Sequence, residues 1–138
     1  MRKALVTGAS RGIGYAIAKK LLQNDCAVVI TGRNISTLEC VARDLGKNVF
    51  PMVWNAMEFE KADEKINKAS DMLGGLDIVV NNAGIFAQRS EWDKNSLLET
   101  TVKEWQDVIN VNSSAVFFTM QAAVNYMLKN NIPGNILN

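Results

Sequence analysis

The chain has 138 residues, of which 48% are hydrophobic and 21% are charged. This composition is typical of a soluble globular protein, and the length predicts one domain over residues 1–138. With 15 basic and 14 acidic residues the net charge is +1, so the charge balance attracts neither nucleic acid nor an anionic membrane. No apolar run approaches the roughly 20 residues of a membrane span.

The cysteine and histidine content excludes several kinds of site. The chain has no histidine, and its two cysteines, Cys26 and Cys40, lack metal-site spacing. We therefore expect no metal site and no histidine-based catalytic triad. Two reduced thiols indicate a cytoplasmic protein, and a first predicted strand that begins by Lys3 leaves no room for a signal peptide.

Short apolar runs alternate along the chain with segments of helical periodicity. In chain order, the predicted elements are a strand at 4–6, a helix at 12–24, a strand at 27–31, a helix at 36–45, a strand at 49–53, a helix at 59–73, a strand at 76–81, a loop at 85–100, a helix at 102–129 and the beginning of a strand at 135–138.

The strands are continuously apolar rather than alternating, which predicts an α/β fold with a parallel sheet covered on both faces. Because crossover connections are right-handed, few topologies remain. A Rossmann-type doubly wound sheet with strand order 3-2-1-4-5 fits best, and it is truncated at strand 5 because the chain ends there.

Four local signals refine this prediction. Ser36 to Glu39 and Thr101 to Glu104 have the spacing of capping boxes, so a helix is expected to begin at each. Pro51 cannot donate to a strand ladder, which predicts an edge position for the third strand. Asn112 has low helix propensity and lies well inside the long helix, where we expect an irregularity.

Three glycines, Gly8, Gly12 and Gly14, separate the first strand from its helix. Glycine permits a tight turn and lets backbone N–H groups approach a pyrophosphate at the positive end of the helix. An ordinary strand–helix turn is the alternative. The position directly after the first strand of an α/β pattern favours a dinucleotide site.

The end of the second strand predicts the choice of nicotinamide cofactor. In dinucleotide-binding folds, an acidic residue at this place binds the ribose 2′-hydroxyl and selects NAD. This chain has Gly32 and Arg33 there, and Arg11 lies in the glycine turn. Guanidinium groups suit a 2′-phosphate, so NADP(H) is expected to be preferred, with NAD(H) possible. The alternative is that both arginines are solvated surface residues.

A second small-residue segment follows the fourth strand. Asn81, Ala83 and Gly84 would meet the glycine turn at the carboxyl ends of the strands, where open α/β sheets bind ligands. Ala83 and Gly84 are small enough to let a ribose lie against the backbone. An ordinary Asn/Gly turn is the alternative.

These segments, TGASRGIG at 7–14, NNAG at 81–84 and Asn112 in the long helix, resemble the short-chain dehydrogenase/reductase family along the whole chain. The resemblance implies that Ser10, Arg11 and Ile13 line the pyrophosphate and adenosine side of a cofactor. It also implies that Asn81, Ala83 and Gly84 shape the cofactor cleft, and that members act on small-molecule substrates as dimers or tetramers.

The same resemblance implies roles for two asparagines. After the third strand the family usually has an Asp that contacts adenine, and Asn55 takes its place here with both a donor and an acceptor. Asn112 corresponds to an asparagine that helps to hold a water in a proton relay, which makes it the candidate catalytic residue. A capping or solvent-facing Asn112 is the alternative.

The family's catalytic Ser and Tyr-x-x-x-Lys are not found in the expected place. Tyr15 and Lys19 have the right spacing, but they follow the glycine turn, so we interpret them as a coincidence. Tyr126 is followed by Asn130 at the lysine position and does not fit. The catalytic residues would come after Asn138.

Our first hypothesis is therefore the NADP(H)-binding part of a short-chain oxidoreductase of the 3-oxoacyl or sugar/alcohol type, inactive as this chain alone. The second is a non-catalytic nucleotide-binding or interaction module. Substrate identity and reaction direction do not follow from the sequence.

Overall fold

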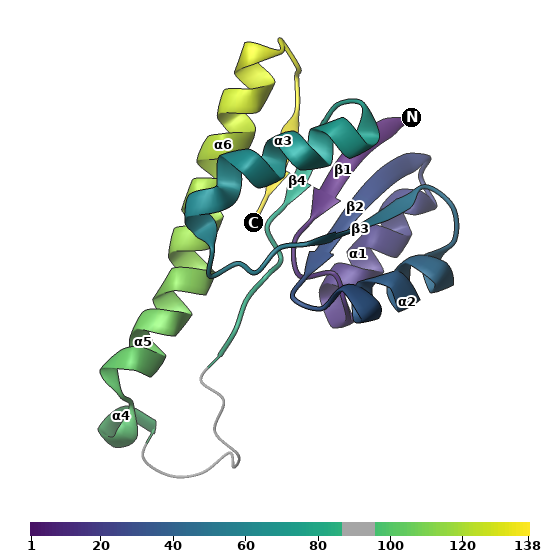
Figure 1. The fold of residues 1–138 in the computed structure, drawn as a ribbon. Coiled ribbons are helices and arrows are strands. Elements are labelled where there is room, and N and C mark those ends of the chain that lie inside the picture. Colours follow the sequence, from purple (N-terminus) through teal and green to yellow (C-terminus); the bar gives the residue numbers. More distant parts are fainter. Residues whose placement is uncertain (87–95) are drawn as a thin grey trace.

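The computed structural model of the chain describes residues 1–86 and 96–138. In this part of the chain, five parallel strands form a sheet in the order β3-β2-β1-β4-β5 (Figure 1). The strands are β1 (Arg2–Val6), β2 (Cys26–Gly32), β3 (Val49–Val53), β4 (Ile78–Val80) and β5 (Asn135–Leu137). The predicted α/β class and strand order are confirmed.

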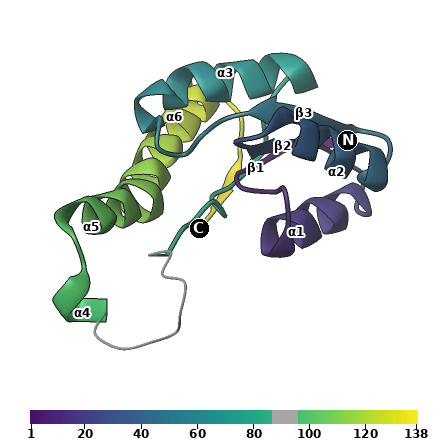
Figure 2. The same ribbon diagram turned by 60° about the horizontal axis from the view of Figure 1, so that its bottom comes forward.

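Helices cover both faces of the sheet (Figures 1 and 2). One face carries α1 (Gly12–Leu22) and α2 (Ile35–Leu45), and the other carries α3 (Ala62–Leu73) and α6 (Ala115–Lys129). The remaining helical segments are the 3₁₀ turn η1 (Phe59–Lys61), α4 (Ser96–Glu99), α5 (Val102–Ile109) and the π-helical turn η2 (Asn110–Ser114).

The central strands are buried on both sides. On β1, Leu5 belongs to the apolar cluster shared with α3 and α6, whereas Val6 belongs to the cluster shared with α1 and α2. Neither side chain is exposed to solvent. Two-sided burial explains why these strands form continuous apolar runs in the sequence.

The edge position predicted for the third strand is confirmed. Among the described residues, β3 pairs only with β2, and Pro51 lies opposite Ile30 in that pairing. A strand with one neighbour in the sheet tolerates a residue that lacks a backbone donor.

The capping box predicted at Ser36 is wrong. α2 begins one residue earlier, at Ile35, and Asn34 is its N-cap. The Asn34 backbone is extended, and its side-chain oxygen accepts a hydrogen bond from the Thr37 N–H at 3.1 Å. Asn34 thus occupies the capping position first and leaves Ser36 inside the first helical turn.

Two predictions on the long helix are confirmed. The Thr101 hydroxyl accepts a hydrogen bond from the Glu104 N–H at 3.1 Å, and the Glu104 carboxylate accepts from the Thr101 N–H at 2.8 Å. The irregularity expected near Asn112 is η2, which joins α5 to α6.

Other element boundaries shift slightly. The predicted strand at 76–81 is shorter at both ends. At its start, the Asp77 carboxylate accepts a hydrogen bond from the Lys3 N–H at 2.8 Å, in place of a ladder carbonyl. The predicted helix at 59–73 starts with the 3₁₀ turn η1. In the predicted loop at 85–100, residues 96–99 form α4, whereas residues 87–95 lie outside the described part.

Candidate functional site

The glycine turn packs tightly against the end of β4 on one side and is open on the other. Gly8 has a φ of 65°, and a Cβ added there would lie 2.7 Å from Ala83 Cα. A Cβ at Gly14 would collide with Gly8 O and with the Asn82 side chain. Gly12, with a φ of 58°, has nothing within 4 Å of its added Cβ. Gly8 and Gly14 therefore serve packing, and Gly12 faces open space.

The N-terminus of α1 has no side-chain cap. Its N-cap residue is Arg11, which makes no capping hydrogen bond, whereas Asn34 caps α2 and Thr101 caps α5. The first N–H groups of a helix lack intrahelical partners and carry partial positive charge. An uncapped start that faces open space over Gly12 is suited to a phosphate group.

A threonine and an asparagine tie β4 to this turn. Thr7 Oγ1 accepts hydrogen bonds from the N–H groups of Asn82 and Ala83, both at 3.0 Å. Asn82 Nδ2 donates to Thr7 O at 2.9 Å and to Gly8 O at 3.0 Å. The site residues predicted from the sequence do not include Thr7 or Asn82. Both stand inside the TGASRGIG and NNAG segments, which was the available signal.

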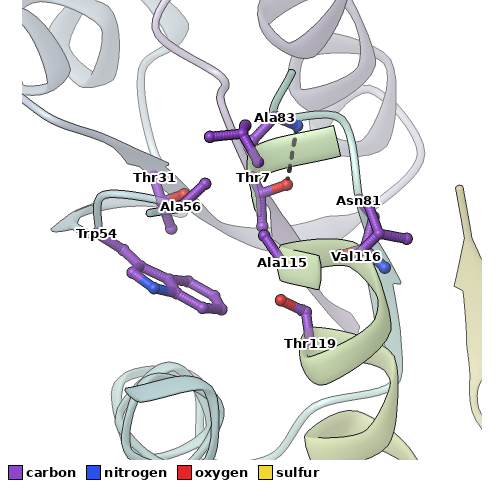
Figure 3. Close-up of a pocket in the computed structure, with 10 residues that line it drawn as sticks. Thr7, Thr31, Trp54, Ala56, Asn81, Ala83, Ala115, Val116 and Thr119 are labelled. Carbon is purple, nitrogen blue, oxygen red and sulfur yellow. Dashed lines mark hydrogen bonds between the residues drawn. The ribbon is translucent and has the colours of Figure 1, made fainter. Parts of the chain in front are cut away.

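A crevice opens where these strands end (Figure 3). The predicted residues Asn81 and Ala83 line it, together with residues that sequence reasoning did not assign: Thr7, Thr31, Trp54, Ala56, Val111, Ala115, Val116 and Thr119. Thr31 lies near the end of β2, and Thr7, Trp54 and Ala56 follow the ends of β1 and β3, whereas the last four residues come from η2 and α6. The structure thus brings the long helix to the carboxyl edge of the sheet, where α/β folds bind ligands.

The other predicted residues of the turn lie at the same edge. A Cβ added at Gly32 would lie 3.6 Å from Ser10 Cβ, so the turn reaches the end of β2. Ile13 is 74% exposed, which leaves an apolar side chain beside the turn without cover in the described structure. Arg11 and Arg33 are exposed, and neither guanidinium has a hydrogen bond or ion pair with any described residue.

Asn55 follows β3 next to the end of β2. The Trp54 N–H donates to Gly32 O at 3.0 Å, which holds the two strand ends together. Asn55 Oδ1 accepts a hydrogen bond from the Met57 N–H at 3.2 Å. The acceptor of this side chain is therefore engaged within its own turn.

Asn112 contacts the segment that follows β4. Its Oδ1 accepts from the Ile85 N–H at 2.8 Å, and its Nδ2 donates to Ile85 O at 2.7 Å. A Cβ at Gly84 would lie 3.5 Å from Asn112 Oδ1, so a small residue suits this approach. Asn112 is therefore neither a cap nor a freely solvated residue. Its function in a proton relay stays a prediction.

The Tyr15 hydroxyl has a hydrogen-bond partner other than Lys19. It donates a hydrogen bond to the Asp44 carboxylate on α2. This hydrogen bond, with smaller contributions from burial and from the negative charge of Asp44, raises the pKa of Tyr15. A tyrosine that acts as a general acid instead needs a pKa lowered toward the operating pH. The contact supports reading the Tyr15–Lys19 spacing as coincidence.

The described residues offer neither a metal-binding group nor a helix that could cross a membrane. Within residues 1–86 and 96–138, no three acidic, cysteine or histidine side chains are grouped so that they could bind a metal ion. No helix in these ranges combines the length and apolar character that crossing a bilayer requires.

Comparison with known proteins assigns the family. The family model described as short chain dehydrogenase matches residues 2–138. The chain belongs to the short-chain dehydrogenase family. This family is one of oxidoreductases that use a nicotinamide cofactor, and the open, uncapped turn at Gly12 fits the phosphates of such a cofactor.

Individual relatives agree with this assignment. The chain is 37% identical over 136 residues to an uncharacterised oxidoreductase of Staphylococcus aureus (strain MW2), covering 98% of the chain and 56% of the relative. It is 34% identical over 135 residues to the 3-oxoacyl-(acyl-carrier-protein) reductase FabG of Vibrio harveyi, covering 98% of the chain and 52% of that reductase. The chain thus spans about half the length of these relatives.

A solved structure shares the fold. A crystal structure from Sinorhizobium meliloti 1021, provisionally described as a short-chain alcohol dehydrogenase, matches with a TM-score of 0.86 and 33% identity. The match covers 98% of this chain and 52% of that one.

Proposed function

We propose that this chain forms the NADP(H)-binding part of a short-chain oxidoreductase. The observation that carries the proposal is the uncapped N-terminus of α1, which faces open space at Gly12 with Arg11 as its N-cap residue. Backbone N–H groups with no side-chain partner there would hold the pyrophosphate of a dinucleotide. Gly8, Gly14 and Ser10 would shape the turn around it, and Ile13 would cover it.

Arg33 and Arg11 support NADP(H) over NAD(H). Both guanidinium groups are exposed and have no partner among the described residues, so they are available to a 2′-phosphate. No carboxylate stands at 32–34 to bind a free 2′-hydroxyl or to repel a phosphate. A charge-assisted hydrogen bond contributes roughly 1.5–3 kcal/mol, which is enough to set the preference.

In the whole protein, the bound nicotinamide would supply or accept the hydride that interconverts a carbonyl and an alcohol. The residues of this chain would bind and orient the cofactor. Asn81, Ala83 and Gly84 would line the cleft, and Asn112 would hold the backbone at Ile85 beside it. A 3-oxoacyl thioester is one substrate class, in line with the Vibrio harveyi relative, and a sugar or simple alcohol is another.

The general acid is not among the tyrosines of this chain. Tyr15 is bound to Asp44, and the Tyr126 hydroxyl shares a hydrogen bond with Ser70. The same contacts favour the second candidate, a nucleotide-binding module without catalysis, if the 138 residues act alone.

We further propose that the protein is cytoplasmic. We also propose that it associates with copies of itself through α5 and α6.

Titration calorimetry with the four cofactor forms tests the proposal. We expect NADPH and NADP⁺ to bind at least tenfold more tightly than NADH and NAD⁺, because only the former carry the 2′-phosphate. The preference should shrink as salt rises, since exposed charges are screened. Absence of binding by all four forms would overturn the proposal, and equal affinity would overturn the choice of NADP(H).

A further inference from the structure

Three buried threonines line the crevice at the carboxyl edge of the sheet (Figure 3). Thr7, Thr31 and Thr119 are 7%, 1% and 2% exposed. Thr31 comes two residues after Val29, whose side chain packs in the apolar cluster with α3 and α6, so Thr31 faces the same side of the sheet. Thr119 is one of the buried residues of α6. Hydroxyl groups from β2 and from the long helix therefore lie on two walls of one crevice.

The hydroxyl of Thr7 is fully engaged by the backbone. Oγ1 donates to Val80 O at 3.3 Å and accepts from the N–H groups of Asn82 and Ala83, both at 3.0 Å. A hydroxyl has one hydrogen to donate and two lone pairs. Thr7 therefore has no capacity left for a further partner.

The hydroxyls of Thr31 and Thr119 lack such partners. Within residues 1–86 and 96–138, neither Oγ1 forms a hydrogen bond with another residue. A threonine inside a helix often donates to the carbonyl one turn earlier, but Thr119 makes no such bond to Ala115. Figure 3 shows the Thr119 hydroxyl directed away from α6, toward the side of the crevice where Trp54 lies.

Both free hydroxyls are nevertheless within reach of a water molecule. Every side-chain nitrogen or oxygen that is closed off from solvent in the described part of the chain has a hydrogen-bond partner. Because the Thr31 and Thr119 oxygens have none, the small surface that each residue exposes includes its hydroxyl. An unpaired hydroxyl in an apolar surrounding costs free energy that a bound water restores. The lining residues carry no charge, which favours a neutral ligand over an ion.

We propose that this crevice is a binding site for ordered water, which links the Thr31 hydroxyl on β2 to the Thr119 hydroxyl on α6. Each hydroxyl can donate or accept, so water can complete both of them. A water-mediated hydrogen bond is nearly as favourable in enthalpy as a direct one. The water thus connects the end of β2 to the long helix. The inference does not depend on the proposed function.

Replacement of threonine by valine removes the hydroxyl and keeps the branched shape. Denaturant titrations give the unfolding constants of the unaltered protein, Thr31→Val, Thr119→Val, the double variant and Thr37→Val. Thr37 is an exposed residue of α2, so its variant makes the same change where the hydroxyl faces bulk solvent.

Each single variant at the crevice should raise the unfolding constant roughly fivefold, because the water loses one partner and the other hydroxyl loses its link. The double variant should raise it no more than either single variant, since no hydroxyl is left unpaired. Thr37→Val should change it by less than about twofold. Single variants that lower the constant or leave it unchanged would mean that the hydroxyls are dry, and would overturn the inference. A double variant whose effect equals the product of the two single effects would overturn the link.

A crystal structure of the unaltered protein gives a second readout that requires no variant to fold. We expect electron density for water within hydrogen-bond distance of both hydroxyls, with and without NADPH. Absence of such density, or a dinucleotide in contact with either hydroxyl, would overturn the inference. Failure of NADPH to bind would overturn the proposed function alone.

Discussion

Asn112 holds Ile85 through both halves of its side-chain amide, at 2.8 Å for Oδ1 and 2.7 Å for Nδ2. One partner lies in the π-helical turn η2, and the other follows the NNAG segment after β4. The Asn112 side-chain amide offers the same donor and acceptor as a peptide group. It therefore pairs with the backbone of Ile85 as a neighbouring strand would. This contact fixes the distance between the long helix and the end of β4.

Asn112→Ala should loosen this connection. Loss of two hydrogen bonds is expected to lower the free energy of unfolding by roughly 1–3 kcal/mol and to speed hydrogen exchange of the Ile85 amide. Asn130→Ala is a matched control, because Asn130 is the C-cap of α6 and its Nδ2 donates to Tyr126 O one turn earlier. Exchange at Ile85 that responds equally to both variants would contradict a specific contact.

Arg33→Asp should reverse the cofactor preference. The carboxylate would repel a 2′-phosphate and accept a hydrogen bond from a free 2′-hydroxyl. We expect NADPH affinity to fall by at least tenfold and NADH affinity to be retained or to rise. Arg2→Asp makes the same charge change at the opposite end of β1 and should leave the ratio of the two affinities unchanged. An unaltered ratio in Arg33→Asp would refute the assignment.

Gly8→Ala and Gly12→Ala should distinguish the glycine needed for packing of the turn from the glycine needed for NADPH binding. At Gly8, positive φ is combined with a Cβ position 2.7 Å from backbone, so we expect a loss of roughly 3 kcal/mol or more of stability. At Gly12 only the strain of positive φ applies, roughly 1–2 kcal/mol, but the methyl group enters the open space over the turn. NADPH binding by Gly12→Ala should therefore fall at least tenfold.

Gly46→Ala controls for the strain at Gly12. Gly46 also has positive φ and nothing within 4 Å of its added Cβ, but it ends α2 away from the turn. At Gly46 a φ of 91° with a ψ of −135° strongly favours glycine, so its variant should lose at least as much stability in thermal unfolding as Gly12→Ala and still bind NADPH normally. If Gly12→Ala bound NADPH as well as Gly46→Ala does, the phosphate would not lie over Gly12.

Tyr15 should make the stability of the protein fall at alkaline pH. Its hydrogen bond to Asp44 raises its pKa in the folded state above the ordinary value of 10.0. The stabilisation is therefore fully present below pH 10 and is lost as the pH rises through the folded pKa. Melting temperatures from pH 8 to 11 should decline less steeply in Tyr15→Phe and in Asp44→Asn. Parallel curves for all three proteins would rule out this contribution.

The strands of this fold could be predicted because both faces of the sheet are covered. Residues such as Leu5 and Val6 are buried on opposite sides, which leaves a continuous apolar run that is too short for a typical buried helix. The start of α2 could not be chosen in the same way. Asn34 and Ser36 both qualify as N-caps, and the extended backbone at Asn34 decides between them.

The glycines of the site could be predicted from the sequence, but its hydrogen bonds could not. Asn82 reaches Thr7 across 75 positions, and no local pattern in the sequence specifies such a pair. The orientation of Asn55 had the same difficulty. The Asn55 side chain carries both a donor and an acceptor. In the folded turn the acceptor, Oδ1, is bound by the backbone N–H of Met57.

The long helix exposes large apolar side chains on its outer surface. The buried residues of α6 are small or flexible, namely Ala115, Thr119, Ala122, Ala123 and Met127, which lets the helix lie close to its neighbours. Several large apolar residues of α5 and α6 are exposed instead: Val102, Trp105, Phe117, Val124 and Leu128. Apolar surface gathered in this way marks an association site.

We therefore expect the purified chain to self-associate and to bind a hydrophobic dye. Replacing both Phe117 and Leu128, 55% and 72% exposed, by Gln should lower the mass measured by light scattering and weaken dye fluorescence. Ile35→Gln, at a 43% exposed apolar residue on α2, should change neither. Burial of these side chains between copies offers roughly 25 cal/mol per Å² of apolar surface, which the two polar replacements remove. A monodisperse monomer without dye binding before any substitution would show that this helix face needs no partner.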